Sequence, residues 1–394
     1  TGTVHPPARE DGDRSTAVAG CSDIDDAGDH MTIRLTYGSQ QQFRHRHHDI
    51  TVLGRVLDAS FPVRAAHWVL NGSASQCLYV EQEPDLNVDW IRGYKQSPGE
   101  LRCRDQGEFC VEIPATRGDL APGENLLSIK VEDSAGALHT AEMVFTWAPE
   151  TVPLPLDLRD LSSYRSIQEI GQAVNGAFDL DPEANAIRSR GPVAPDALLL
   201  LGSPHGSQEA TYRARFTETA GAKWLGLSDF FAGLTEGEPP RGIKVGWCSA
   251  GMAALSPTDG GRAFLAWGDH SGDRREWAVA TNPAAPVEVR RDRAYRVRHQ
   301  FCHHEGIGRV RYRIWPEGTP EPDDWLCVEE DRKVPPELPR NRQGSFGLFQ
   351  HMGHPIEWSD ILVRRCDPTA DDLPGMDPDG ARAPFLQRVR PGAF

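Results

Sequence analysis

Short runs of alternating polar and apolar residues recur along most of the chain, and turn residues separate them. Alternation with a period of two predicts strands that bury one face, because successive side chains on a strand point to opposite sides of the sheet. The 38 glycines and 31 prolines among 394 residues supply frequent turns between these runs. Clear examples are residues 49–56, 109–113, 126–131 and 141–147. The pattern predicts an all-β protein.

The spacing of these runs predicts several segments. Residues 1–31 lack periodicity and are expected to form an extended N-terminal arm, and residues 32–148 a first β-sandwich. Three prolines between Ala148 and Pro155 indicate a stiff linker. We expect five parts in all: the arm 1–31, the first sandwich 32–148, a linker with one short helix 149–176, a larger sandwich 177–366 and an irregular tail 367–394.

Two stretches resemble known families. The run DLAPGENLLSIKVEDSAGALHTAEMVFTW, residues 119–147, resembles the closing strands of bacterial immunoglobulin-like modules. Residues 294–325 and 344–365, which include RIWPEGTPEPDDW and GSFGLFQHMGHPIEWSDILVRR, are similar to the final strands of concanavalin A-like lectin/glucanase domains, including laminin-G-like modules. The resemblance implies an immunoglobulin-like sandwich followed by a jelly roll. It implies little about activity, because that superfamily contains lectins, adhesins, hydrolases and lyases.

Charge and cysteine usage limit the compartment and the partners. The formal net charge of −15 disfavours nucleic acid as a partner, and no apolar run is long enough to predict a membrane span. Eight cysteines without a CxxC spacing favour disulfides over metal binding, and hence a secreted or cell-surface protein. We expect a Cys103–Cys110 bond and a Cys302–Cys327 bond, with buried free thiols as the alternative.

The densest group of aromatic and polar residues lies between residues 267 and 277. Sugar recognition combines a flat aromatic ring with side chains that hydrogen-bond two hydroxyls. This chemistry selects candidate glycan-binding residues in the second sandwich; packing of the tryptophans in the core is the alternative. The candidates are Trp247, Trp267, Asp269, His270, Trp277, Arg298 and His299.

Asp269 and Asp273 suggest a cation site. Two carboxylates separated by backbone carbonyls are ligands suited to Ca²⁺, which laminin-G-like modules often bind on a rim loop. The spacing is not that of an EF-hand, and an Asp- and Gly-rich hairpin turn is the alternative. Calcium is therefore the one cofactor that the sequence suggests.

Enzyme signatures are scarce. A glycosidase needs two carboxylates, one of them protonated, and only Glu276 with Asp269 or Glu357 with Asp360 could be paired. No catalytic serine, phosphate-loop or zinc-protease motif occurs. The sequence thus favours a non-catalytic extracellular protein that binds glycan or matrix. A polysaccharide hydrolase or lyase, and a self-assembling surface, filament or virion component, remain as alternatives.

Overall fold

The structure is a computed structural model. It describes residues 33–83, 102–103, 105–190, 196–217, 225–235, 242–244, 246–256, 261–269, 277–282, 287–304, 307–325, 327–331, 343–351, 355–366 and 386–387. The predicted N-terminal arm and most of the predicted tail lie outside these residues. Thr32–Phe394 group into one compact unit.

The predicted all-β class is confirmed. In the described ranges the helical content is one 3-10 turn, η1 (Ile167–Glu169). No helix of these ranges is long and apolar enough to cross a bilayer.

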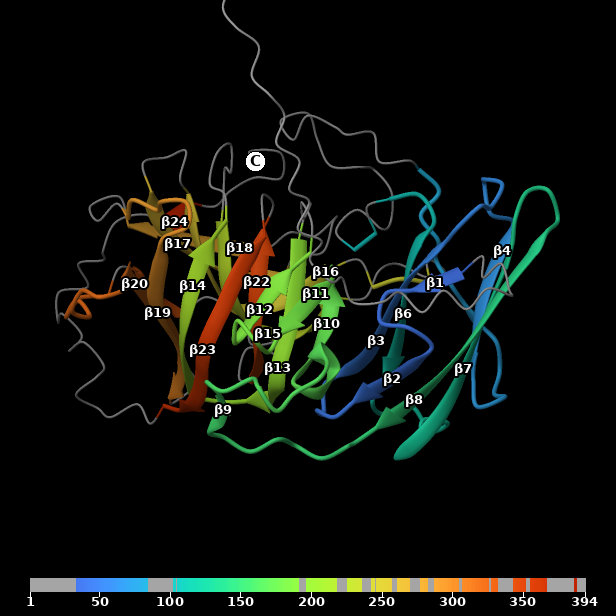
Figure 1. Ribbon diagram of the computed structural model, residues 1–394, viewed down its shortest axis with the longest axis horizontal. Helices are drawn as coiled ribbons and strands as arrows, with labels where there is room; N and C mark the ends of the chain where they lie inside the picture. Colours follow the sequence, from blue (N-terminus) through green and yellow to red (C-terminus); the bar gives the residue numbers. More distant parts are fainter. Residues whose placement is uncertain are drawn as a thin grey trace, which may run out of the picture. The chain divides into compact units, whose positions relative to one another are not determined.

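The first sandwich is built from eight strands in two sheets (Figure 1). The three-stranded sheet has the order β1-β3-β6, and the five-stranded sheet has the order β2-β8-β7-β4-β5. β2 pairs in parallel with β8. The strands are β1 (Ile33–Leu35), β2 (Gln40–Phe43), β3 (Asp49–Val56), β4 (Ala65–Leu70), β5 (Gln76–Cys77), β6 (Glu108–Pro114), β7 (Gly123–Glu132) and β8 (Leu138–Trp147).

Alternation along these strands builds the core of the first sandwich. β8 alternates strictly between exposed and buried positions over its ten residues, with Met143 and Phe145 buried. Val52 and Val111 from the other sheet belong to the same buried cluster, so the two sheets pack face to face.

The second sandwich consists of two larger sheets (Figure 1). One has the order β10-β13-β22-β15-β16-β17-β18-β24. The other has the order β11-β12-β23-β14-β19-β20-β21, with β9 also paired to β23. The strands are β9 (Leu156–Leu158), β10 (Gly171–Asn175), β11 (Phe178–Asp181), β12 (Ala186–Ser189), β13 (Asp196–His205), β14 (Gln208–Phe216), β15 (Leu225–Thr235), β16 (Gly246–Ser256), β17 (Arg262–Asp269), β18 (Trp277–Asn282), β19 (Ala294–His304), β20 (Ile307–Pro316), β21 (Cys327–Asp331), β22 (Gly344–His351), β23 (Ile356–Arg365) and β24 (Leu386–Gln387).

The segment 149–176 contains a short helix, the 3-10 turn η1, and also two strands. β9 pairs with β23 and β10 pairs with β13, so the chain joins the sheets of the larger sandwich in this segment. Leu158 and Val174 are buried. Burial of these apolar side chains helps to hold the segment on the larger sandwich.

A hydrogen-bonded chain of buried polar groups connects the two sheets of the second sandwich. Tyr212 Oη on β14 lies 2.7 Å from Ser228 Oγ on β15, and Ser228 Oγ lies 2.9 Å from His299 Nδ1 on β19. All three residues are fully buried. The imidazole also packs on the Phe230 ring, with centroids 4.5 Å apart. Burial disfavours the charged imidazolium and lowers the pKa of His299 to about 3.

This shift predicts acid-sensitive folding. The unfolded state takes up a proton near pH 6.5 while the folded state does so only near pH 3, so stability is lost as the pH falls between these values. Between pH 7 and pH 4 the titration of His299 lowers the free energy of unfolding by about 3 kcal/mol. Urea unfolding at both pH values checks this, with His299→Asn as the comparison. The wild type should lose about 3 kcal/mol more than the variant, and an equal loss in both would contradict the assignment.

Candidate functional site

Trp247 is a core residue. Its side chain is fully buried on β16 and packs edge-on against Phe349, with ring centroids 6.2 Å apart. A buried ring offers no face to a sugar, so the predicted stacking role does not fit this position. The sequence signal was ambiguous because a large aromatic residue suits both a core and a binding surface.

Arg298 and His299 point to opposite sides of β19. His299 lies in the core, whereas Arg298 is partly exposed and makes ion pairs on the outer face of the sheet. Of these two predicted ligands, only Arg298 is placed where a ligand can reach it.

Other predicted site residues lie at the edge of what the structure describes. Trp267 on β17 is opposite Ala278, and Trp277 on β18 is opposite Gly268. Asp269 ends β17, while His270 and Asp273 fall outside the described residues. Within the described part of the chain no group of three or more His, Cys, Asp or Glu side chains is placed to hold a metal. The calcium site therefore stays a prediction.

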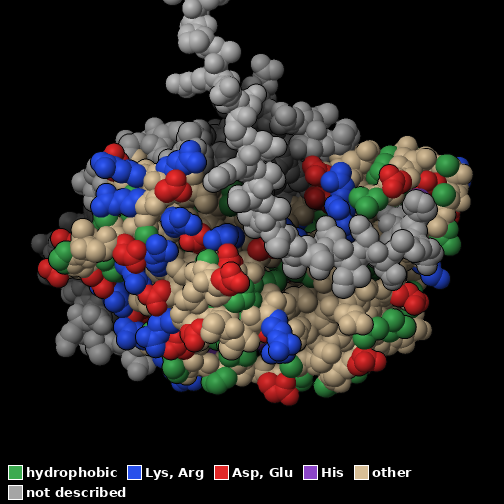
Figure 2. Space-filling model, viewed as in Figure 1, with side chains coloured by type: hydrophobic (Ala, Val, Ile, Leu, Met, Phe, Trp, Pro, Cys, Tyr) green, Lys and Arg blue, Asp and Glu red, His purple; other side chains and the backbone are tan. Residues whose placement is uncertain are grey.

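Arginines alternate with apolar residues on the strands of the β23-β14-β19-β20 sheet. On β19 Arg296 and Arg298 flank the buried Val297, and on β20 Arg311 and Arg313 flank the buried Tyr312. Strand geometry therefore places these arginines on one outer face. Figure 2 shows basic and acidic side chains gathered over β14, β19 and β23. We call the following set the arginine face: Glu209, Arg298, Gln300, Arg311, Arg313, Glu321, Trp325 and Arg364.

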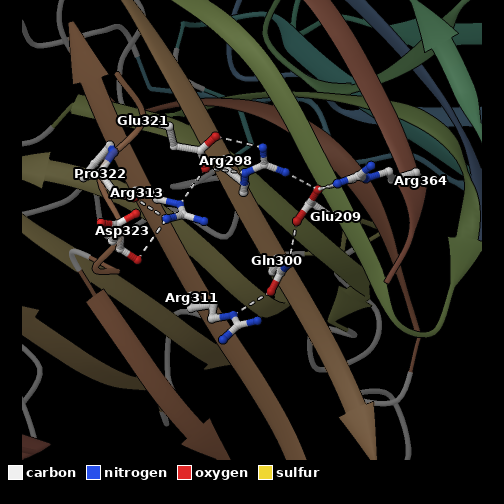
Figure 3. Close-up of polar contacts among 9 residues, drawn as sticks. All are labelled: Glu209, Arg298, Gln300, Arg311, Arg313, Glu321, Pro322, Asp323 and Arg364. Carbon is white, nitrogen blue, oxygen red and sulfur yellow. Dashed lines mark hydrogen bonds and ion pairs between the residues drawn. The ribbon is translucent and has the colours of Figure 1, made fainter. Parts of the chain in front are cut away.

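Glu209 on β14 is the centre of this set (Figure 3). Its carboxylate accepts hydrogen bonds from Arg298 and Gln300 on β19, and from Arg364 on β23 at 2.6 and 2.9 Å. The register places Glu209 opposite both Gln300 and Arg364. The Glu209 side chain is only 5% exposed, so its charge depends on these donors in place of water.

Glu321 joins Arg298 to a further arginine, Arg313. Its carboxylate accepts from Arg298 Nε at 2.6 Å and Nη2 at 2.9 Å, a two-bond contact that fixes the guanidinium plane. Arg313 Nε lies 2.7 Å from the same carboxylate. The hydrogen bond from Arg298 is the main cause that holds the pKa of Glu321 below its usual value, with burial opposing it.

Trp325 completes the arginine face. The guanidinium carbons of Arg311 and Arg313 each lie 4.3 Å from the centroid of its ring, within the range of cation–π attraction. Arg311 Nε also donates to Gln300 Oε1 at 2.5 Å. The tryptophan is half-buried, so part of its surface remains open to solvent.

The arginine face carries an excess of positive charge. Its four guanidinium groups meet two carboxylates, Glu209 and Glu321, so the charges of the set sum to +2, although Arg298, Arg313 and Arg364 each contact a carboxylate. The whole chain has a net charge of −15. This surface is therefore opposite in sign to the average of the chain.

The carboxylate pair Glu357 and Asp360 does not resemble a catalytic pair. Burial raises the pKa of Glu357, but hydrogen bonds from Arg215 and Arg188 outweigh it and hold the pKa below its usual value. Asp360 forms an ion pair with Arg296. The lowered pKa of Glu357 disfavours the protonated form that a general acid requires. Glu276 lies outside the described residues.

Two pairs of cysteine sulfur atoms lie close together, and one of these pairs is a predicted one. Cys103 Sγ and Cys110 Sγ lie 3.8 Å apart, so the predicted partners are neighbours, and their bond stays a prediction. The predicted Cys302–Cys327 bond also stays a prediction, because the side chain of Cys327 lies outside the described ones. Cys302 is opposite Arg309 and Cys327 is opposite Tyr312, whereas the Sγ atom of Cys366 lies 2.9 Å from that of Cys302.

Comparison with known proteins gives structural similarity alone. No family model matches the chain, and no curated protein matches it. A carbohydrate-binding module (CBM66) from Bacillus subtilis aligns over 49% of this chain and 94% of its own, with 10% identity and a TM-score of 0.32. The carbohydrate recognition domain of Emp46p aligns over 53% and 95%, with 12% identity and a TM-score of 0.37. The GH43 protein BlXynB from Bacillus licheniformis aligns over 80% and 63%, with 9% identity and a TM-score of 0.35. Similarity at this level carries no argument about function.

Sequence reasoning missed Glu209, Glu321 and Trp325 as site residues. Glu209 and Arg364 are 155 positions apart, so their contact has no local signal. The repeated Arg-x-Arg spacing at residues 213–215, 296–298 and 311–313 is the signal that could have marked one charged sheet face.

Loss of the Glu209 charge should destabilise the fold more than loss of an exposed carboxylate nearby. Glu209→Gln leaves Arg298 and Arg364 without their shared carboxylate, at a cost of about 2 kcal/mol. Glu317→Gln is the matched control, because Glu317 pairs with Arg213 and Arg296 but is 37% exposed. We expect it to cost less than about 1 kcal/mol. Denaturant unfolding measures both variants, and equal losses would contradict the central role of Glu209.

Proposed function

We propose that the arginine face is a carbohydrate-binding surface, and that this protein is a non-catalytic glycan-binding protein. The observation that carries the proposal is the half-buried Trp325 ring beside ordered Arg, Glu and Gln side chains on a rigid sheet. Sugars are recognised by this combination, because their C–H faces pack on aromatic rings and their hydroxyls need paired donors and acceptors.

The order of the polar side chains supports this proposal. Arg298 is held by two carboxylates, and Gln300 is held between Glu209 and Arg311. Side chains that are already fixed lose little conformational entropy when a ligand binds. They lie on strands rather than on loops, which keeps their spacing constant.

The charge of the arginine face supports an acidic sugar as the ligand. Guanidinium groups bind carboxylates and sulfates through two parallel hydrogen bonds. The excess of guanidinium groups over carboxylates in the set, four against two, favours a uronate or sulfated glycan over a neutral one.

We further propose that the first sandwich is an immunoglobulin-like spacer and that the protein acts outside the cell. The order β1-β3-β6 and the order β8-β7-β4 match the A-B-E and G-F-C order of immunoglobulin sheets. The two pairs of adjacent cysteine sulfurs are compatible with an oxidising compartment.

Binding should depend on both the aromatic ring and the charge. We expect the wild type to bind oligogalacturonate or sulfated oligosaccharides on a glycan array more strongly than neutral oligoglucans. Trp325→Ala and Arg298→Gln should each weaken this binding by about 1–3 kcal/mol. Higher salt should weaken it as well, because part of the attraction is between charges.

Arg190→Gln is the matched control. Arg190 pairs with Asp179 and is half-exposed, but it is not part of the arginine face. Its loss should leave glycan binding unchanged. Wild-type protein that binds no glycan on the array, or release of reducing ends or unsaturated uronates by the wild type, would contradict a non-catalytic binding protein.

A further inference from the structure

Two cysteines far apart in sequence meet at the end of the sheet that carries the arginine face. Cys302 belongs to β19 and Cys366 directly follows β23. Their Sγ atoms lie 2.9 Å apart, and a disulfide bond requires about 2.05 Å. A shift of less than about 1 Å would therefore bring the sulfur atoms to bonding distance.

The sheet itself brings these sulfurs together. Glu209 on the middle strand, β14, accepts hydrogen bonds from Gln300 and from Arg364. Cys302 and Cys366 each follow one of these residues by two positions, so strand alternation places them on the same outer face. The backbone N–H of Cys366 also donates to the carbonyl of Ser207, one residue before β14, at 3.3 Å. The ends of β19 and β23 thus converge on the start of β14.

We propose that Cys302 and Cys366 form a disulfide that joins β19 to β23. Two thiols lose two protons and two electrons as the S–S bond forms. A low-molecular-weight disulfide takes up the two protons and the two electrons and is reduced to two thiols. The reaction passes through a mixed disulfide, in which the thiolate of one cysteine attacks the small disulfide and the second cysteine then displaces the small thiol.

Cys302 and Cys366 differ in how readily they start this exchange. The hydrogen bond with Cys366 and burial raise the pKa of Cys302, and the charges of Arg311 and Arg309 only partly oppose that rise. The raised pKa disfavours the thiolate of Cys302, which is the reacting species in exchange. Cys366 is less buried than Cys302, so a small disulfide reaches it first.

The bond would close a loop of considerable length. Residues 303–365 lie between the two cysteines and include β20, β21, β22 and β23. In the chain-entropy model a cross-link over so many residues restricts the unfolded state strongly and stabilises the fold. It would also hold Gln300 and Arg364 at a fixed distance on either side of Glu209.

Peptide mapping of the wild type tests the connectivity directly. The protein is kept under a non-reducing condition with a small disulfide present, free thiols are blocked with N-ethylmaleimide, and trypsin is added. We expect one cross-linked species made of residues 299–309 and 366–382, which reduction separates. Blocked thiols on both peptides, or a link from residues 299–309 to residues 314–332, which contain Cys327, would overturn the proposal.

Thermal unfolding with and without dithiothreitol tests the effect on stability. The wild type should melt several degrees lower when reduced. The Cys302→Ser/Cys366→Ser variant should melt at a lower temperature than the oxidised wild type. Dithiothreitol should lower the melting temperature of this variant less than that of the wild type. The decrease that remains in the variant would come from Cys103 and Cys110. Cys77→Ser is the control, because Cys77 is exposed and lies in the first sandwich. Equal dithiothreitol responses of the wild type and the double variant would contradict the bond.

Discussion

The carboxylate of Glu209 is the interaction on which the outer face of the second sandwich depends. It lies on the middle one of three adjacent strands and accepts hydrogen bonds from both neighbours, through Arg298, Gln300 and Arg364. A nearly buried charge tolerates few arrangements, because any shift in register would leave it without donors. The same contact therefore fixes strand register, orders the arginine face and brings Cys302 close to Cys366.

The two faces of these strands lie in different environments, one in the core and one at the surface. The inner face carries Tyr212, Val297 and Tyr312, which are almost fully buried, and the outer face carries arginine and glutamate. The inner residues supply the hydrophobic stabilisation of the fold. The outer residues add little stability where they are exposed, which leaves them available for recognition. In this sheet the apolar and the charged side chains thus occupy alternate positions.

Strand positions were predictable from the sequence, whereas the identity of the site was not. The expected strands 49–56, 126–131 and 141–147 correspond to β3, β7 and β8, because alternation is a local property. The sequence could not show that Trp247 faces the interior while Trp325 lies beside two arginines. It also could not show that the Sγ atoms of Cys302 and Cys366 lie 2.9 Å apart, since this contact depends on the order of strands β23, β14 and β19. The surroundings of a tryptophan and the neighbour of a cysteine are both set only when strands distant in sequence have paired.

The positive face on a negatively charged chain has a kinetic consequence. A molecule whose net charge is −15 is repelled on average by an anionic polymer, yet the region around Arg298, Arg311 and Arg313 is attracted to it. The opposing forces exert a torque during approach, so the protein turns the arginines toward the polymer before contact. Encounters in other orientations dissociate without binding. For the acidic glycan proposed as the ligand, the distribution of charge would therefore favour one direction of approach.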